Sequence, residues 1–162
     1  MPIFDVRFCK NPAIQELVML RQVGAIPFAI RETEPLVLMI TSRTHERWIF
    51  PKGAVEEGET AAEAALREAY EEAGIRGRML DQFAHEVQAI KQMPDGPRDL
   101  IVTYIPLHFA EQHDDWPERK NRDRHWVILS DARKIARGPD IHGALEGFEA
   151  LLPSLHSIAK IK

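Results

Sequence analysis

A series of acidic residues at fixed spacing constrains this chain more than any other part of its sequence. It reads Gly53, five residues, Glu, seven residues, Arg-Glu, two residues, Glu-Glu, one residue and Gly74. In a helix, Glu68, Glu71 and Glu72 stand at positions i, i+3 and i+4 and share one face. Carboxylates this close repel each other by roughly 3 kcal/mol per pair when they are partly shielded from water. Because a divalent cation removes that repulsion, the pattern indicates a metal site.

The flanking residues predict the helix that this reading requires. Thr60 and Glu63 fit a capping box, in which each side chain satisfies a backbone N–H of the other residue. Gly74 is suited to the left-handed position that ends many helices. We therefore expect one helix between Thr60 and Gly74.

Part of the acidic series has a purely structural explanation. Glu63, Arg67 and Glu71 are spaced four residues apart, and such pairs support a surface helix by a few tenths of a kcal/mol. Glu68 and Glu72 have no basic residue within the helix one turn away. Structural support alone therefore does not account for these two carboxylates.

Composition sets the broad class. With 162 residues, 44% hydrophobic and 28% charged, we expect one globular domain over residues 1–162. The formal net charge of −4 does not favour nucleic-acid binding. Cys9 is the single cysteine, which excludes an intrachain disulfide and a cysteine-based zinc site. Residues 1–10 lack a signal-peptide pattern and no apolar run reaches ~20 residues, so we expect a cytoplasmic protein without a membrane span.

Apolar runs and turn residues give a coarse map of the chain. They predict strands at 23–30, 36–40, 47–50, 79–89, 100–109 and 126–129. Pro27 suggests that the first of these lies at a sheet edge or carries a bulge. Loops are predicted at 91–99 and 112–124, and further helices at 131–136 and 141–152. This mixture favours an α/β domain with a mixed sheet.

In order and distance, the spacing matches the Nudix box, and the chain resembles the Nudix hydrolases. One departure is Ala69, where the family usually has a larger aliphatic residue. The resemblance implies a mixed β-sheet sandwiched between α-helices, and hydrolysis of phosphoanhydride bonds with Mg²⁺ or Mn²⁺. It implies metal ligation by Glu68 and Glu72, with the carbonyl of Gly53 as a further ligand. It also implies that Glu71 acts with Glu68 in catalysis as the base for the attacking water, and that Arg67 orients these glutamates.

A narrower likeness lies outside the box. Residues 48–53, Trp116 and residues 122–126 resemble the diphosphoinositol polyphosphate phosphohydrolases, which act on inositol pyrophosphates and diadenosine polyphosphates. Lys52 departs from that branch, which commonly has glycine there. The resemblance implies a phosphorylated small-molecule substrate, for which guanidinium groups are suited. The candidate substrate-binding residues are Arg43, Ser42, Lys52, Arg122, Arg124 and Arg21.

Other functions stay open at this point. ADP-ribose, RNA ends or damaged nucleotides are alternative substrates for the same chemistry. A non-catalytic Nudix-fold module that senses a nucleotide is an alternative of another class, although such modules typically lose box glutamates that this chain retains. A generic α/β domain with an acidic helix would show no metal dependence. Glu86, Glu111 and Glu118 are open candidates for a ligand outside the box, and the chain is expected to be a monomer or a homodimer.

Overall fold

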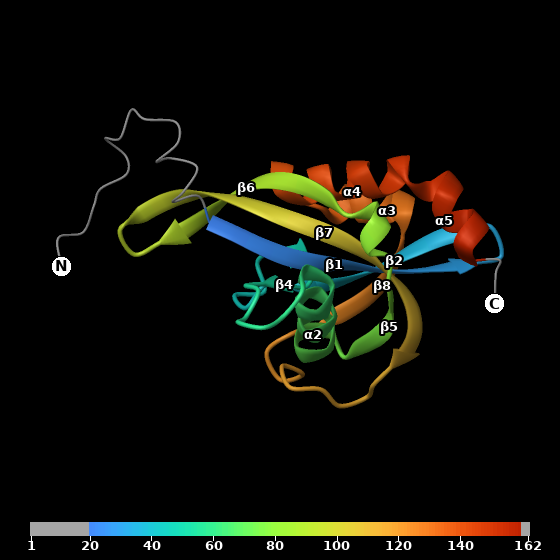
Figure 1. The fold of residues 1–162 in the computed structure, drawn as a ribbon, viewed down its shortest axis with the longest axis horizontal. Helices are drawn as coiled ribbons and strands as arrows, with labels where there is room; N and C mark the ends of the chain where they lie inside the picture. Colours follow the sequence, from blue (N-terminus) through green and yellow to red (C-terminus); the bar gives the residue numbers. More distant parts are fainter. Residues whose placement is uncertain (1–19, 160–162) are drawn as a thin grey trace.

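The computed structural model describes residues 20–159, so the predictions that concern Cys9 and residues 1–10 lie outside the described residues (Figure 1). Within the described part, eight strands form one mixed sheet with the central order β3-β2-β1-β7-β5. Strand β4 pairs with β1, β6 with β7 and β8 with β2. The strands are β1 (Leu20–Arg31), β2 (Glu34–Thr41), β3 (Trp48–Ile49), β4 (Lys52–Gly53), β5 (Ile75–Met79), β6 (His85–Met93), β7 (Gly96–Gln112) and β8 (Arg124–Ile128).

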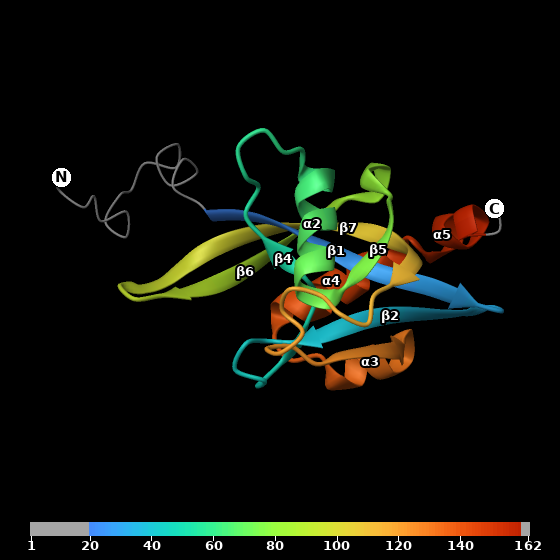
Figure 2. The ribbon, with the colours of Figure 1, turned by 90° about the horizontal axis from the view of Figure 1, so that it is seen from below.

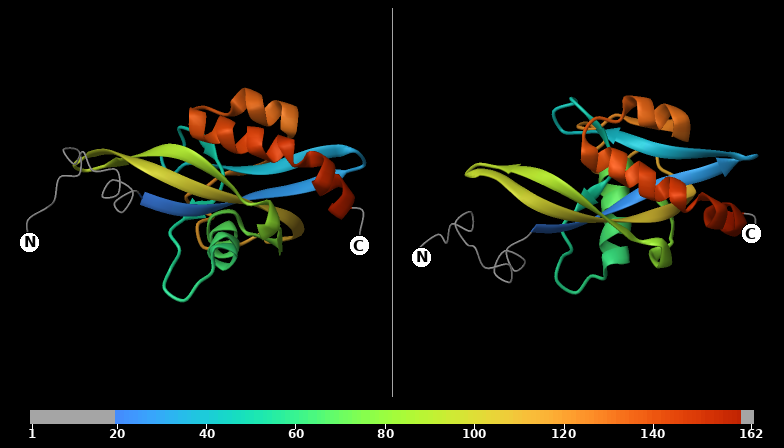
Figure 3. Two further views of the ribbon diagram at one scale, coloured as in Figure 1. Left: turned by 45° about the horizontal axis from the view of Figure 1, so that its top comes forward. Right: turned by 90° about the horizontal axis from the view of Figure 1, so that it is seen from above.

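Helices cover both faces of this sheet. Helix α2 (Ala61–Ala73) lies on one face, and α3 (Leu129–Ile135), α4 (Pro139–Ala150) and α5 (Leu152–Ala159) lie on the other (Figures 1 and 3). Two separate clusters of buried side chains follow from this arrangement, one under α2 and one under the other three helices. The expected mixed sheet between helices is therefore confirmed.

The buried side of α2 consists of small residues. Its alanines at 64, 65, 69 and 73 are fully buried against β1, β5 and β7. Small side chains let a helix approach the sheet closely, which gives Ala69 a packing role where the family usually has a larger residue. Strand β4 and the loop that follows it lie beside α2 (Figure 2).

Strand β1 is central rather than at an edge. It runs parallel to β7 along one side, and on its other side it pairs with β4 at Val23 and Gly24 and with β2 from Phe28 onward. The pairing with β4 therefore ends before Pro27, and the pairing with β2 begins after it. A proline without an N–H to donate is accommodated at this gap between ladders. The predicted edge position was therefore wrong, and the register with β7 continues through Pro27 without the bulge that was the alternative, whereas the strand itself was predicted correctly.

Three other predicted boundaries were wrong. The predicted strand 79–89 is divided between β5 and β6 by a 3₁₀ turn at Asp81–Phe83, which turns Leu80 into the core. The predicted loop 91–99 is a β-hairpin closed by Pro94 and Asp95. Its residues are mostly exposed and polar, so they lack the apolar alternation that indicates a strand. The predicted helix 141–152 ends at Ala150, and α5 starts anew at Leu152 with a proline in its first turn.

Among the described residues, no helix is both long and apolar enough to cross a bilayer.

Candidate metal and hydrolase site

Helix α2 begins and ends where the sequence predicted. The backbone N–H of Glu63 donates to Thr60 Oγ1 at 3.1 Å, and the Thr60 N–H donates to Glu63 Oε2 at 3.1 Å. Gly74 adopts a φ of 67°, and its N–H donates to Tyr70 O at 2.9 Å. These caps fix which residues of α2 face the loop after β4.

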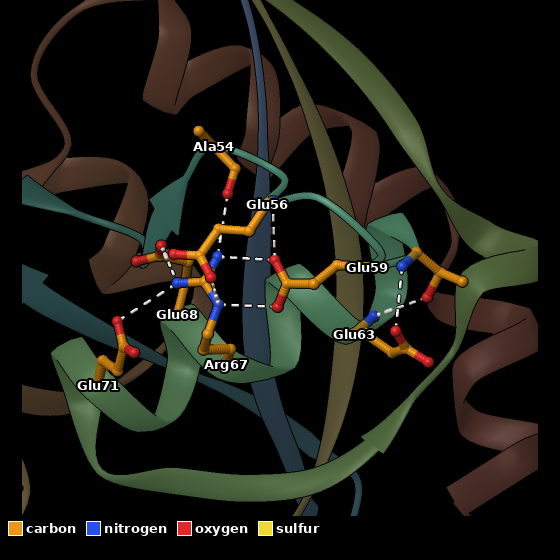
Figure 4. Close-up of polar contacts among 8 residues, drawn as sticks. Ala54, Glu56, Glu59, Glu63, Arg67, Glu68 and Glu71 are labelled. Carbon is orange, nitrogen blue, oxygen red and sulfur yellow. Dashed lines mark hydrogen bonds and ion pairs between the residues drawn. The ribbon is translucent and has the colours of Figure 1, made fainter.

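Arg67 lies at the centre of the acidic cluster (Figure 4). Its Nε and Nη2 donate to the two oxygens of Glu59 at 2.8 and 3.0 Å. Its Nη1 donates to Glu68 at 2.8 Å and to Glu71 at 3.4 Å, and Nη2 also reaches Ala54 O at 3.0 Å. The bidentate pair raises the pKa of Arg67 and lowers the pKa of Glu59. Arg67 therefore fixes carboxylates from the loop and from two turns of the helix.

Glu72 is the most enclosed carboxylate of the site. It is 5% exposed, and its Oε2 has no hydrogen-bond partner among the described residues. Its nearest cation is Arg122, whose Nη2 lies 3.5 Å from that oxygen. Burial raises the pKa of Glu72 to about 8, with Arg122 opposing the rise and Glu68 and Glu118 adding to it. A buried carboxylate oxygen without a donor is costly, and it provides a free ligand for a cation.

Glu68 is held close to the backbone of β4. Its side chain is 13% exposed, and burial raises its pKa while Arg67 opposes that rise. A Cβ atom at Gly53 would overlap the Glu68 carboxylate. Pairing of Gly53 with Val23 of β1 fixes this close approach, so glycine is needed here for steric reasons.

The carboxylates are not gathered as a ready-made cage. Among residues 20–159, no group of three or more His, Cys, Asp or Glu side chains is arranged to hold a metal ion. Glu68 turns toward Arg67, while Glu72 lies beside Arg122. Mg²⁺ usually keeps several waters and needs only one or two protein carboxylates. The unpartnered Glu72 oxygen, with Glu68 one turn away, fits that mode of binding.

The predicted substrate-binding residues fall into two groups. The Arg43 side chain is 78% exposed, and its guanidinium lies 3.9 Å from Glu118. Ser42 is its neighbour in the chain. Arg21 is exposed on β1, and its guanidinium lies 3.5 Å from Glu86 of β6. These side chains are accessible to a ligand. Lys52 is half-buried on β4, and burial lowers the pKa of its amine, with Asp140 opposing.

The two downstream arginines are engaged with the protein. Arg122 is 7% exposed and donates to Thr41 O at 3.0 Å and to Glu118 at 3.2 Å. Arg124 donates to Ala73 O at 2.9 Å. The structure thus places both guanidinium groups next to α2 and not in open solvent.

Trp116 and Glu118 also lie at this site. The sequence had pointed to both, to Trp116 through the likeness to the diphosphoinositol polyphosphate phosphohydrolases and to Glu118 as an open candidate for a ligand outside the box. Trp116 Nε1 donates to Glu72 O at 3.1 Å, and Glu118 brings a third carboxylate close to Glu68 and Glu72. Both lie more than forty residues from α2 in a segment that reads as a charged loop. The residue spacing within this loop does not predict which parts of α2 the two side chains contact.

Known proteins resemble this chain in sequence and in fold. The NUDIX domain family model matches residues 20–145. Nudix hydrolase 12, mitochondrial, of Arabidopsis thaliana is 37% identical over 117 residues, covering 69% of this chain and 57% of the relative. Diphosphoinositol polyphosphate phosphohydrolase 3-alpha of Homo sapiens is 28% identical over 117 residues, covering 71% and 68%. A C. elegans Ap4A hydrolase structure superposes with a TM-score of 0.65 at 23% identity, covering 84% of this chain and 99% of that one.

The first of these relatives is longer than the matched region, since the chain spans 57% of its length. The family match nevertheless covers the whole site, from β1 to α4. It confirms the family that the box residues had indicated. The chain belongs to the NUDIX domain family.

Proposed function

We propose that this protein hydrolyses phosphoanhydride bonds in a polyphosphorylated or nucleoside-diphosphate-linked small molecule, with Mg²⁺ or Mn²⁺ as cofactor. The observation that carries the proposal is the buried oxygen of Glu72, which accepts no hydrogen bond from the described residues, beside Glu68 on the same face of α2. A divalent cation neutralises negative charge on the phosphates and lowers the pKa of bound water.

Glu68 and Glu72 are the proposed metal ligands, and the carbonyl of Gly53 is a further one. Arg67 keeps Glu68 and Glu71 oriented through its contacts with both. Glu71 is the proposed base that takes the proton of the attacking water. Its side chain is 39% exposed and contacts Arg67 at the long distance of 3.4 Å, which leaves it accessible to a water molecule.

The best substrate candidates are diphosphoinositol polyphosphates and diadenosine polyphosphates. Support comes from the likeness to the human phosphohydrolase and from the exposed side chains of Arg43 and Arg21, with the half-buried Ser42 next to Arg43. Lys52 is a further candidate contact for the substrate. Burial lowers the pKa of its amine, and the negative charges of Asp140 and Glu72 oppose that lowering. Arg122 and Arg124 were predicted to bind phosphate as well, but their contacts with α2 support a different role, developed below. The cytoplasmic location, the single domain over 1–162 and the monomeric or homodimeric state stay predictions.

A substrate panel tests the proposal. Inositol pyrophosphate, diadenosine polyphosphate, ADP-ribose and capped RNA are incubated with the protein and Mg²⁺ or with EDTA, and the products are followed by ³¹P NMR. We expect turnover of the first two substrates, with Mg²⁺ only. Dominant turnover of ADP-ribose would refute the substrate class. Calorimetric binding of a nucleotide without any turnover would favour a sensing module instead.

A further inference from the structure

The C-terminal end of α2 is covered by the segment between β7 and β8, residues 113–123, which Figures 1 and 2 both place against it. A helix leaves its last carbonyl groups without partners inside the helix. Here four consecutive carbonyl oxygens, at 71–74, each accept a hydrogen bond from this segment or from the first residue of β8. The donors are Glu118 N to Glu71 O (3.0 Å), Trp116 Nε1 to Glu72 O (3.1 Å), Arg124 Nη1 to Ala73 O (2.9 Å) and His113 N to Gly74 O (2.8 Å).

The charge at this helix end explains why a partner from elsewhere is needed. Glu71 and Glu72 lie in the last turn, which contains no basic residue. Acidic side chains at the negative end of the helix dipole are unfavourable, and a cation there is favourable. Arg124, from 51 residues further along the chain, supplies that cation at Ala73 O.

Arg124 and Trp116 act on the helix end as one unit. The Arg124 guanidinium lies 3.9 Å from the centroid of the Trp116 ring, a cation–π geometry that restricts both side chains. Gly74 allows their approach, because a Cβ there would lie 2.8 Å from Arg124 Nη1 and 3.0 Å from the Trp116 ring. Each of the two side chains donates to one carbonyl of α2, and each is restricted by the other.

The covering segment is itself tied to the sheet. Arg122 Nη1 donates to Thr41 O at 3.0 Å, the Asp123 N–H donates to Thr41 Oγ1 at 2.9 Å, and the Thr41 N–H donates to Asp123 O at 3.0 Å. Through these bonds the last turn of α2 is held relative to β2 and not only relative to its own loop.

We propose that Trp116 and Arg124 are positioning residues that hold the last turn of α2, and with it the ligand Glu72, in the geometry needed to bind the cation. The inference rests on the proposed function for the role of Glu72 as a metal ligand. The competing assignment is the one implied by the sequence resemblance, in which Arg124 contacts the substrate phosphates.

Two matched substitutions separate these assignments. Trp116→Phe and Arg124→Met each remove one donor to α2 while keeping most of the side-chain volume. Arg119→Met is the control, because Arg119 is a 59% exposed cation of the same segment whose guanidinium lies 3.8 Å from Asp115 and does not donate to α2 among the described contacts. Arg124→Lys restores the charge in a milder variant that keeps the test interpretable if Arg124→Met folds poorly.

The readouts are Mn²⁺ affinity of the substrate-free protein, measured by electron paramagnetic resonance of free Mn²⁺, and hydrogen exchange of the amides at 70–74. We expect Trp116→Phe and Arg124→Met to weaken Mn²⁺ binding by about tenfold, as loss of an outer-sphere partner does. Both variants should exchange faster at 70–74, Arg124→Lys should recover part of each effect, and Arg119→Met should match wild type. The KM for substrate at saturating metal should not change.

Other outcomes would overturn the proposal. If Arg124→Met raises the KM at saturating metal but leaves Mn²⁺ affinity and exchange unchanged, Arg124 is a substrate ligand. Unchanged exchange in both variants would also refute the positioning role. If wild type itself binds no Mn²⁺, the proposed function fails, and the exchange rates alone then decide whether these two residues hold the helix end.

Discussion

Replacement of Glu72 by glutamine should stabilise the metal-free protein, and the gain should grow with pH. Burial raises the pKa of Glu72 from its ordinary 4.5 to about 8. At about 1.36 kcal/mol per pKa unit, this rise corresponds to at most about 5 kcal/mol of unfolding free energy. Because water entry and relaxation reduce the cost of a buried charge, we expect a gain of roughly 2–4 kcal/mol at alkaline pH.

The sign follows from proton linkage. Below about pH 4.5 the carboxyl is neutral in the folded and unfolded chains, so Glu72 carries no penalty. Between this pH and about 8, the folded chain retains a proton that the unfolded chain has released, and stability falls as pH rises. Glutamine does not ionise. The unfolding free energy of Glu72→Gln should therefore equal that of wild type near pH 4.5 and exceed it by a growing amount up to about pH 8.

Urea unfolding in EDTA across this pH range measures the difference. Glu71→Gln is the matched control, because Glu71 lies in the same turn but its side chain is 39% exposed. Added Mg²⁺ should stabilise wild type and leave Glu72→Gln unaffected. A constant difference between wild type and Glu72→Gln, or a variant that is less stable at alkaline pH, would refute the reasoning.

Three further predictions follow from the same contacts. Gly53→Ala should reduce Mn²⁺ affinity and turnover together, because its Cβ occupies the space of the Glu68 carboxylate; unchanged Mn²⁺ titrations would contradict this. Arg67→Met should lower the unfolding free energy in EDTA by about 1–3 kcal/mol, since hydrogen bonds to charged groups are lost, and equal urea midpoints would count against it. Mg²⁺ binding at neutral pH should release a proton from Glu72, whose pKa is raised to about 8; calorimetric enthalpies that are identical in buffers of different ionisation enthalpy would exclude such release.

The helix and its acidic face could be predicted from the sequence because their determinants are local. The capping box at Thr60 and Glu63, the glycine at 74 and the i, i+4 spacing of Glu68 and Glu72 all lie within one element. The contact of Arg67 with Glu71 is of the same kind. Such features depend on backbone geometry that every α-helix shares.

The surroundings of that face depend on contacts between distant segments, which spacing does not encode. Arg122 reaches Thr41 across 81 residues, and Trp116 reaches Glu72 across 44. Both side chains lie in a polar stretch that resembles a solvated loop. The tip of the β6–β7 hairpin was missed for another reason. Residues 91–99 are mostly polar and include two prolines and a glycine, so the sequence there lacks the apolar alternation that identifies a strand.

The central claim is that Glu72 binds a divalent cation that phosphoanhydride hydrolysis requires. Its most direct test is ³¹P NMR of diadenosine polyphosphate incubated with wild type and with Glu72→Gln, each in Mg²⁺ and in EDTA. We expect new phosphate resonances only for wild type in Mg²⁺. If wild type in EDTA, or Glu72→Gln in Mg²⁺, forms as much product as wild type in Mg²⁺, the claim is contradicted.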